Sequence, residues 1–260
     1  MDYENIKVET RDGIATLTVN RPDKLNALNK AMWQGVDAAF RDLARDETVR
    51  CVVLTSAGGK AFSPGADIAE FGTERADVAQ ATSYGGLMHG AMGAIGACPH
   101  PTLAVIHGIC VGGGLELAAM CDLRICGASS RFGVPINRIG VVMAYPEMEA
   151  LIGLVGRAVA LEILFEGRVF GADEALQKGL VNRVVADDQV TAEGQAAARR
   201  IADGAPLVNR WHKKFARRLG DAAPLSAKEQ AEGFAAFGTE DFREGVRAFL
   251  AKEKPRFRGR

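Results

Sequence analysis

Three glycines followed by a glutamate form the part of the sequence best suited to chemistry. Residues 112–116 read Gly-Gly-Gly-Leu-Glu, between an apolar strand-like segment at 103–111 and an apolar helix-like one at 115–123. Glycine lets another molecule approach the main chain closely, and the first N–H groups of a helix have no partner within it. Such N–H groups can hold a developing negative charge, with Glu116 beside them as an acid or base. The sequence therefore predicts an active site here.

A second glycine-containing loop follows the strand-like residues 52–55. Residues 56–68 read Ser-Ala-Gly-Gly-Lys-Ala-Phe-Ser-Pro-Gly-Ala-Asp-Ile, and the loop is expected to enter a helix. Two such loops at the ends of neighbouring strands can supply two N–H groups that converge on a single oxygen.

Strands and helices alternate in the first part of the chain. Residues 6–8 and 14–19 alternate around a turn and predict a hairpin, and the helical spacing of apolar residues at 29–46 predicts an amphipathic helix with Asn29 as its N-cap. The further elements expected are strands at 49–55, 103–111 and 123–126, and helices at 80–97 and 115–122. This order predicts a parallel sheet with helical crossovers.

Beyond residue 145 helix follows helix. The predicted helices span residues 147–155, 158–166, 172–178, 190–203 and 206–219. Ser226 predicts the cap of one more helix. We expect a core over residues 1–195 and a helical C-terminal region over residues 196–260.

Composition excludes several classes of protein. The 260 residues are 48% hydrophobic, enough for a full core, and 32 basic residues balance 32 acidic ones. No overall field would therefore attract nucleic acid or an anionic membrane. No segment approaches the roughly 18 apolar residues of a membrane span, and the first residues lack the pattern of a signal peptide. A cytoplasmic globular protein is expected.

Cysteine and histidine spacing predicts neither a disulfide nor a metal site. The five cysteines form no Cys-x-x-Cys pair, and the four histidines show no ligand spacing. His107 is expected to be packed or hydrogen-bonded, whereas His89 lies in a segment rich in Gly and Met that could flank a pocket.

Five segments match the motifs of one known family. They are residues 20–28 (Asn-Arg-Pro-Asp-Lys-Leu-Asn-Ala-Leu), 61–67 (Ala-Phe-Ser-Pro-Gly-Ala-Asp), 107–116 with 121–124, 132–135 (Phe-Gly-Val-Pro) and 167–181. In these segments, which span nearly the whole chain, the protein resembles the enoyl-CoA hydratase/isomerase family, also called the crotonase family. The combination of Gly-Ala-Asp with Gly-Gly-Gly-x-Glu at this separation is highly specific.

The resemblance implies a fold, a substrate class and an assembly. The fold would be α/β, a crotonase (ClpP/crotonase-like) spiral of ββα turns with a helical C-terminal trimerisation region. The substrate would be an acyl-CoA or enoyl-CoA thioester, with no cofactor, since coenzyme A is part of the substrate. The assembly would be a homotrimer or a dimer of trimers, with no nucleic-acid or membrane partner.

The resemblance also assigns roles to individual residues. The N–H groups of Ala66 and Gly113 would form an oxyanion hole for the thioester carbonyl, and Glu116 would transfer a proton. Oriented N–H donors stabilise an enolate because they need no reorganisation as charge develops. The residues matching substrate-binding positions are Leu25 and Ala27 along the coenzyme A channel, Asp67 and Ile68 on the same wall with Ala66 and Gly113, and Lys24 and Lys252 toward the nucleotide phosphates. Asp67 has the alternative role of a helix cap.

One position departs from the family pattern. Hydratases of this family carry a second glutamate directly after Phe-Gly-x-Pro, where this chain has Ile136. Adding water across a conjugated double bond is easiest when two carboxyl groups act as base and acid. With Ile136 there, the expected pair is broken.

Three explanations for this departure stay open. Glu116 acts alone in a hydratase or isomerase, or Tyr145, Glu147 or Glu149 replaces the missing group, although Glu147 directly follows Pro146 and is expected primarily to stabilise a helix start. Alternatively, the enzyme decarboxylates a malonyl-type thioester, which gives the same enolate. The string Pro-Ile-Asn at 135–137 resembles that of methylmalonyl-CoA decarboxylases.

The resemblance also allows two non-enzymatic roles, RNA binding and that of an inactive structural relative. Some relatives bind RNA, but the neutral charge and the lack of a basic stripe with interleaved aromatic residues argue against this role. An inactive structural relative would not need Glu116. The sequence therefore predicts an enoyl-CoA hydratase-like enzyme, with a malonyl-type acyl-CoA decarboxylase or an enoyl-CoA isomerase as the alternatives.

Overall fold

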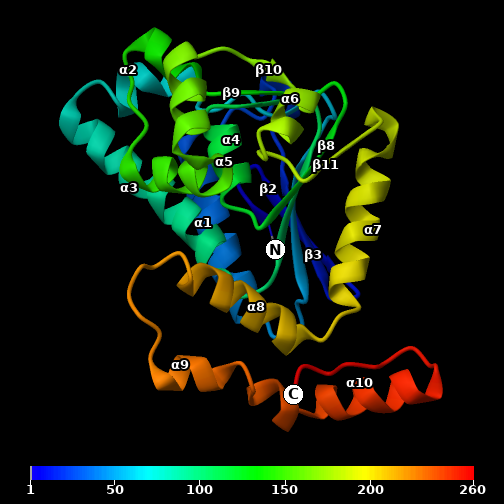
Figure 1. Ribbon diagram of the computed structural model, residues 1–260. Coiled ribbons are helices and arrows are strands. Elements are labelled where there is room, and N and C mark those ends of the chain that lie inside the picture. The colour runs from blue at the N-terminus through cyan, green and yellow to red at the C-terminus, as the bar shows by residue number, and fades with distance from the viewer. Residues whose placement is uncertain (1) are drawn as a thin grey trace.

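The strands of the protein form two sheets (Figure 1). The structure, a computed structural model, describes residues 2–260. The larger sheet contains, in spatial order, β1 (Asp2–Tyr3), β2 (Ile6–Arg11), β3 (Ile14–Val19), β4 (Cys51–Ser56), β6 (Thr102–Ile106), β8 (Leu123–Gly127) and β11 (Arg183–Val185). The smaller sheet contains β10 (Phe170–Gly171), β9 (Arg131–Gly133), β7 (Ile109–Val111) and β5 (Ala61–Ser63).

Ten α-helices within residues 2–260 connect and cover these strands. They are α1 (Lys30–Arg45), α2 (Phe71–Glu74), α3 (Val78–Ala97), α4 (Gly113–Ala119), α5 (Tyr145–Glu166), α6 (Ala172–Gln177), α7 (Val190–Ala202), α8 (Pro206–Arg218), α9 (Ala227–Glu232) and α10 (Glu240–Ala251). The predicted cap of the first helix is confirmed, because the Asn29 side chain accepts a hydrogen bond from the Met32 N–H at 3.0 Å. None of these helices is long and apolar enough to cross a membrane.

The larger sheet is parallel beyond its first hairpin, as the alternation of elements predicts. β2 and β3 pair antiparallel, which confirms the hairpin, and β3, β4, β6, β8 and β11 then pair parallel. Every side chain of β6 is buried, because the sheet is covered on both faces. Residues of α1, α3 and α4 belong to the main apolar cluster, whereas α7 packs with β4, β6 and β8 in a separate one.

The apolar run at 103–111 forms two strands rather than the predicted single strand. The chain breaks at Gly108, which has a φ of 59° and where a Cβ would lie 2.0 Å from the Lys60 carbonyl oxygen. Only glycine tolerates both conditions. β6 therefore stays in the larger sheet, while β7 enters the smaller one.

One other expectation is corrected in detail, and another is confirmed. The loop at 56–68 does not run directly into a helix, because its middle forms β5, and a 3₁₀ turn at Ile68–Glu70 follows. The helices predicted at 147–155 and 158–166 are both present within α5, which is interrupted at Gly156 by a φ of 75°.

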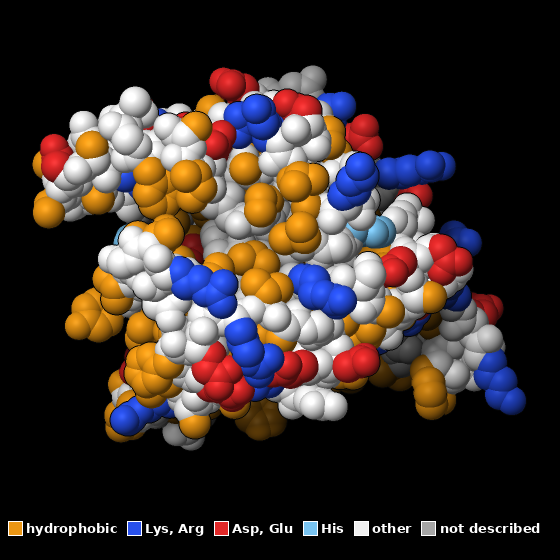
Figure 2. Space-filling view, turned by 90° about the horizontal axis from the view of Figure 1, so that it is seen from above, with side chains coloured by type: hydrophobic (Ala, Val, Ile, Leu, Met, Phe, Trp, Pro, Cys, Tyr) orange, Lys and Arg blue, Asp and Glu red, His pale blue; other side chains and the backbone are white. Residues whose placement is uncertain are grey.

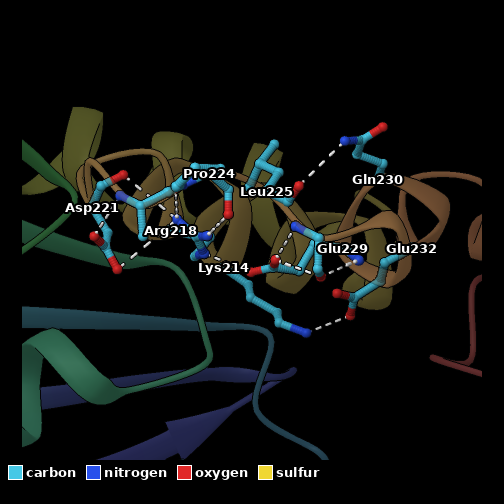
Figure 3. Close-up of polar contacts among 10 residues, drawn as sticks. Lys214, Arg218, Asp221, Pro224, Leu225, Glu229, Gln230 and Glu232 are labelled. Atoms are coloured by element: carbon cyan, nitrogen blue, oxygen red, sulfur yellow. Dashed lines mark hydrogen bonds and ion pairs between the residues drawn. The ribbon is translucent and has the colours of Figure 1, made fainter.

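The C-terminal helices form a separate layer at the bottom of Figure 1. The predicted boundary between residues 195 and 196 falls inside α7, which packs against the larger sheet, so the change of layer comes after Ala202. Polar contacts join α8 to α9, as Figure 3 shows: Arg218 Nη2 donates to the Pro224 carbonyl oxygen at 3.0 Å, and Arg218 Nε to Glu229 Oε1 at 2.5 Å. The predicted cap of α9 is confirmed, because Ser226 forms a capping box with Glu229.

The opposite end of the molecule carries apolar surface. Figure 2 shows this end from above, with apolar side chains gathered between Lys and Arg side chains. Exposed apolar residues of α5 and the loop before it are Val142, Tyr145 and Phe165. The five cysteines are all buried and free, in agreement with the absence of a disulfide pattern.

Candidate active site

The smaller sheet brings the two glycine-containing loops together. β5 and β7 are neighbouring parallel strands, so their carboxyl ends lie at the same edge and both loops leave from it. The two backbones touch, since a Cβ on Gly65 would lie 3.1 Å from the Gly113 nitrogen and 3.1 Å from the Val111 oxygen. The strands that position the loops are therefore the short β5 and β7, rather than β4 and β6.

The close approach of the two loops explains why residues 112–114 are all glycine. Gly112 has a φ of 53° and a ψ of −126°, a turn conformation that an L side chain rarely adopts. A Cβ on Gly114 would lie 2.4 Å from the Ser63 oxygen. The first turn of α4 therefore packs directly against the end of β5 only because these residues lack side chains.

The N–H groups of Ala66 and Gly113 have no hydrogen-bond acceptor anywhere in residues 2–260. Ala66 lies in a short bridge in which the Leu28 N–H donates to the Gly65 oxygen and the Asp67 N–H to the Leu28 oxygen, both at 2.8 Å. These bonds use the groups on either side of Ala66 and leave its own N–H free. Gly113 is the first residue of α4, where N–H groups lack intrahelical partners. Both predicted donors are thus available to a ligand.

Glu116 is buried in the first turn of α4, with 9% of its surface exposed. Burial, the largest cause, and the nearby Glu147 carboxylate together raise its pKa to about 8, with Arg75 opposing the shift. Glu116 therefore carries a proton at neutral pH and is poised as a general acid. It lies three residues after the free N–H of Gly113.

A second carboxylate reaches this region from α5. Glu147, in the first turn of α5, is only 6% exposed, and its Oε1 lies 3.0 Å from His89 Nε2 of α3. The expected helix-start position is correct, but the side chain is buried rather than solvated. The sequence alone gave Glu147 as one of three candidates to replace the missing glutamate and did not show that it lies near Glu116. The other two are excluded by exposure, since Tyr145 is 91% exposed and Glu149 is also at the surface.

Ile136 occupies the position of the missing glutamate and packs against the core. It belongs to the 3₁₀ turn Pro135–Ile139 and is partly buried against the main apolar cluster. The sequence singled out His89, and its side chain contacts the buried Glu147. His107 is a hydrogen-bonded residue, as expected, and its Nε2 lies 3.2 Å from the Thr191 hydroxyl.

The predicted channel residues lie on the loops beside Ala66. Leu25 is 40% exposed with a φ of 53°, and Ile68 is 66% exposed, so both present apolar surface to solvent. Asp67 has a structural role as well: it accepts from Arg21 Nη1 at 2.6 Å and from the Ala69 N–H at 3.1 Å. These bonds lower the pKa of Asp67, the bond from Arg21 contributing most. The cap expected as the alternative for Asp67 is thus present.

The two lysines differ in position. Lys24 is exposed in the turn after β3, and its charge acts on Asp67, which places it near the predicted channel. Lys252 follows the end of α10, in the bottom layer of Figure 1, whereas α4 lies in the upper part. One copy of the chain therefore does not bring Lys252 together with the other site residues, and its role stays a prediction.

Asn26 supports the site and was not assigned a role from the sequence. It is 1% exposed, its Nδ2 donates to the carbonyl oxygens of Ala57 and Ala61 at 2.9 and 2.8 Å, and its Oδ1 accepts from the Arg21 N–H at 2.9 Å. The sequence did contain a signal for this role, an amide side chain within residues 20–28. A buried loop needs such a side chain to pair its backbone polar groups. In the described part of the chain, no group of acidic, His and Cys residues could hold a metal ion.

The raised pKa of Glu116 predicts a pH-dependent stability. Between the ordinary value of 4.5 and about 8 the folded state holds a proton that the unfolded state releases. The contribution of Glu116 to the free energy of unfolding should therefore be highest below the ordinary value and fall, by at most about 1.4 kcal/mol per pH unit, as the pH rises to about 8. Urea unfolding at fixed protein concentration, compared with Glu116→Gln, measures this difference. A difference that stays constant with pH would contradict the assignment.

Two free N–H donors beside a buried carboxylic acid, on two sheets crossed by helices, define an acid–base enzyme of the crotonase fold. Residues 9–260 match the family model described as "Enoyl-CoA hydratase/isomerase". Relatives include a protein of Rhizobium meliloti named "Probable enoyl-CoA hydratase", 36% identical over 100% of both chains, and the crotonyl-CoA hydratase of Syntrophomonas wolfei, 34% identical over 99% of both.

A solved structure agrees with this match. An "enoyl-CoA hydratase/ carnithine racemase" from Magnetospirillum magneticum superposes with a TM-score of 0.97 at 52% identity, covering 100% of this chain and 97% of the other. The chain belongs to the enoyl-CoA hydratase/isomerase, or crotonase, family, as its motifs indicated, and it is an enzyme of that family.

Proposed function

We propose that this enzyme acts on an acyl-CoA or enoyl-CoA thioester and holds its enolate at the N–H groups of Ala66 and Gly113, in an enoyl-CoA hydratase-like reaction. The observation that carries the proposal is the pair of unpartnered donors beside Glu116, an acid that keeps its proton at neutral pH. The relatives named enoyl-CoA hydratase support it.

The chemistry follows from these groups. The two N–H donors polarise the thioester carbonyl and stabilise the enolate, and loss of one such donor typically raises the barrier by about 3 kcal/mol. Glu116 then gives its proton to the carbon next to the thioester. Removal of a proton from that carbon is the same step in reverse.

The proposed substrate contacts follow the family match. The residues that would bind the coenzyme A part are Lys24, Leu25, Ala27, Asp67, Ile68 and Lys252. Coenzyme A would belong to the substrate, and no separate cofactor is expected. A cytoplasmic location is part of the same proposal.

A homotrimer or a dimer of trimers is also proposed. It is supported by large apolar side chains left exposed in the C-terminal helical layer, such as Phe234 at 72%, Phe237 at 62% and Phe249 at 83%. Association would remove this apolar area from water. Light scattering of the purified protein gives the mass that decides between these assemblies and a monomer.

Decarboxylation of a malonyl-type thioester is a second candidate because Ile136 is apolar and packed against the core where a second glutamate would stand. An apolar residue beside a substrate carboxylate would favour its loss as carbon dioxide. Isomerisation needs only one carboxyl group to move a proton between two carbons, and Glu116 could do this alone.

A panel of three thioesters tests the proposal. We expect the wild type to hydrate crotonyl-CoA, which is measured as the loss of the enoyl absorbance. Turnover of a 3-enoyl-CoA and of methylmalonyl-CoA should be weaker or absent. Release of carbon dioxide from methylmalonyl-CoA without hydration would establish the decarboxylase instead. Free crotonate serves as the control without coenzyme A. Absence of turnover of all three thioesters would contradict the proposal.

A further inference from the structure

We propose that Glu147, positioned by His89, is the second acid–base residue of this site and replaces the carboxylate that Ile136 removes. The inference rests on the proposed function, because it assigns the base for the water that adds to an enoyl thioester. It gives this chain a two-carboxylate site assembled from α4 and α5, with the second carboxylate eleven residues after the usual position.

The fold places the two acids together. Glu116 lies in the first turn of α4 and Glu147 in the first turn of α5, and α4 and α5 pack against each other. Both residues are at least nine-tenths buried. Glu147 is close enough to Glu116 for its charge to raise the pKa of Glu116. Two buried carboxyl groups at this proximity do not both ionise easily, which favours the neutral form of Glu116.

Glu147 is only half satisfied in the structure. Its Oε1 lies 3.0 Å from His89 Nε2, but its Oε2 is buried and has no hydrogen-bond partner among residues 2–260. Leaving a buried carboxylate oxygen without a partner is costly, more so when the group is charged. A water or substrate hydroxyl at Oε2 would satisfy it, which is what a general base binds.

The surroundings divide the roles between the two acids. Glu116 has no side-chain hydrogen bond within the described residues, and burial favours its neutral form. Glu147 contacts His89, and its charge acts on Glu116. Arg75, whose Cζ lies 3.6 Å from the centroid of the Tyr84 ring, contributes positive charge to the same region. Glu116 is therefore the acid, and Glu147, which has an imidazole partner, is the base.

The resulting step is balanced. The water oxygen forms a bond to the β carbon while one water proton passes to Glu147. The electron pair of the double bond moves onto the thioester, and the N–H groups of Ala66 and Gly113 stabilise that enolate. The carbon next to the thioester then takes the proton of Glu116. The product is a 3-hydroxyacyl thioester, and a proton returns from Glu147 to Glu116 directly or through solvent.

Two assays separate the roles of the two acids. Hydration of crotonyl-CoA needs both acids. Exchange of the protons next to the thioester of butyryl-CoA, followed in deuterium oxide near the pKa of Glu116, needs only the ionised form of Glu116 as base and the oxyanion hole. Glu147→Gln should lower the hydration kcat by about 10²- to 10⁴-fold, with a much smaller change in KM, and keep the exchange reaction. Glu116→Gln should lose both reactions. Glu149→Gln, an exposed change two residues along α5, is the matched control and should leave both unchanged.

His89 is tested as a positioning residue. His89→Ala should lower hydration and spare exchange, and His89→Gln, which keeps an amide donor for Glu147 Oε1, should restore part of the hydration rate. A purely structural role for His89 would lower the melting temperature and both reactions together.

The outcomes distinguish this inference from the proposed function. If wild-type protein hydrates crotonyl-CoA and Glu147→Gln does so at the same rate, Glu147 is not the base, while the proposed function stands. If Glu147→Gln loses exchange as well as hydration, the assigned division of roles is wrong. If the wild type neither hydrates nor exchanges these thioesters, the proposed function itself fails.

Discussion

Glu116→Gln should abolish almost all thioester turnover, with a loss of about 10²- to 10⁴-fold in kcat for hydration of crotonyl-CoA. The amide has nearly the shape of the neutral carboxylic acid that burial maintains, but it has no proton to give at the reacting carbon. Its substrate binding should change little, because the N–H groups of Ala66 and Gly113 are unaltered. Steady-state kinetics and thioester binding by calorimetry measure the two effects separately.

The direction of the pH dependence follows from the same residue. Since the pKa of Glu116 is raised to about 8, the wild-type hydration rate should fall as the pH rises above that value and the acid loses its proton. The Glu149→Gln variant serves as the control and should follow the wild type. Turnover by Glu116→Gln at the wild-type rate would remove Glu116 from the mechanism.

Gly114→Ala should have the second large effect, because it acts on the geometry of the oxyanion hole. Its Cβ would lie 2.4 Å from the Ser63 oxygen, which is backbone and cannot move aside easily. The start of α4 must then shift away from β5 and carry the Gly113 N–H away from that of Ala66. We expect hydration to fall by about 10²- to 10³-fold, as for loss of an oxyanion donor.

The same change should lower the free energy of unfolding by about 1–3 kcal/mol through overpacking. Gly93→Ala is the matched control, since a Cβ there meets nothing within 4 Å on an exposed position of α3. It should leave activity intact and stabilise the helix by up to about 1 kcal/mol. Full activity of Gly114→Ala would show that the contact between α4 and β5 does not set the donor geometry. Kinetics and urea unfolding of both variants provide the comparison.

Periodicity and turn chemistry predicted most elements, and they failed where tertiary contacts overrode them. The hairpin of β2 and β3 and the capped helix α1 were predictable because their signals are local. The division of 103–111 into β6 and β7 was not, because both strands are apolar and only the approach of Gly108 to the Lys60 oxygen requires the break. Apolar runs carry no information about which sheet they join.

The candidate site shows the same contrast. Ala66, Gly113 and Glu116 could be proposed from the sequence, since glycine loops and a first-turn acid are local features that match a specific family motif. Asn26 was missed because its bonds to Ala57 and Ala61 join segments more than thirty residues apart. Sequence spacing does not reveal such contacts.

The sequence by itself determined the family and predicted the two N–H donors and the first acid, because each depends on residue types within short segments. Only the tertiary structure decided how Glu147 is used. At 147 a glutamate after Pro146 has the local pattern of a helix start, and a carboxylate there is normally solvated. The packing of α5 against α4 buries it beside Glu116 and within 3.0 Å of His89, three residues brought together from three helices. Long-range packing removed both acids from water and raised the pKa of Glu116, which no local pattern encodes.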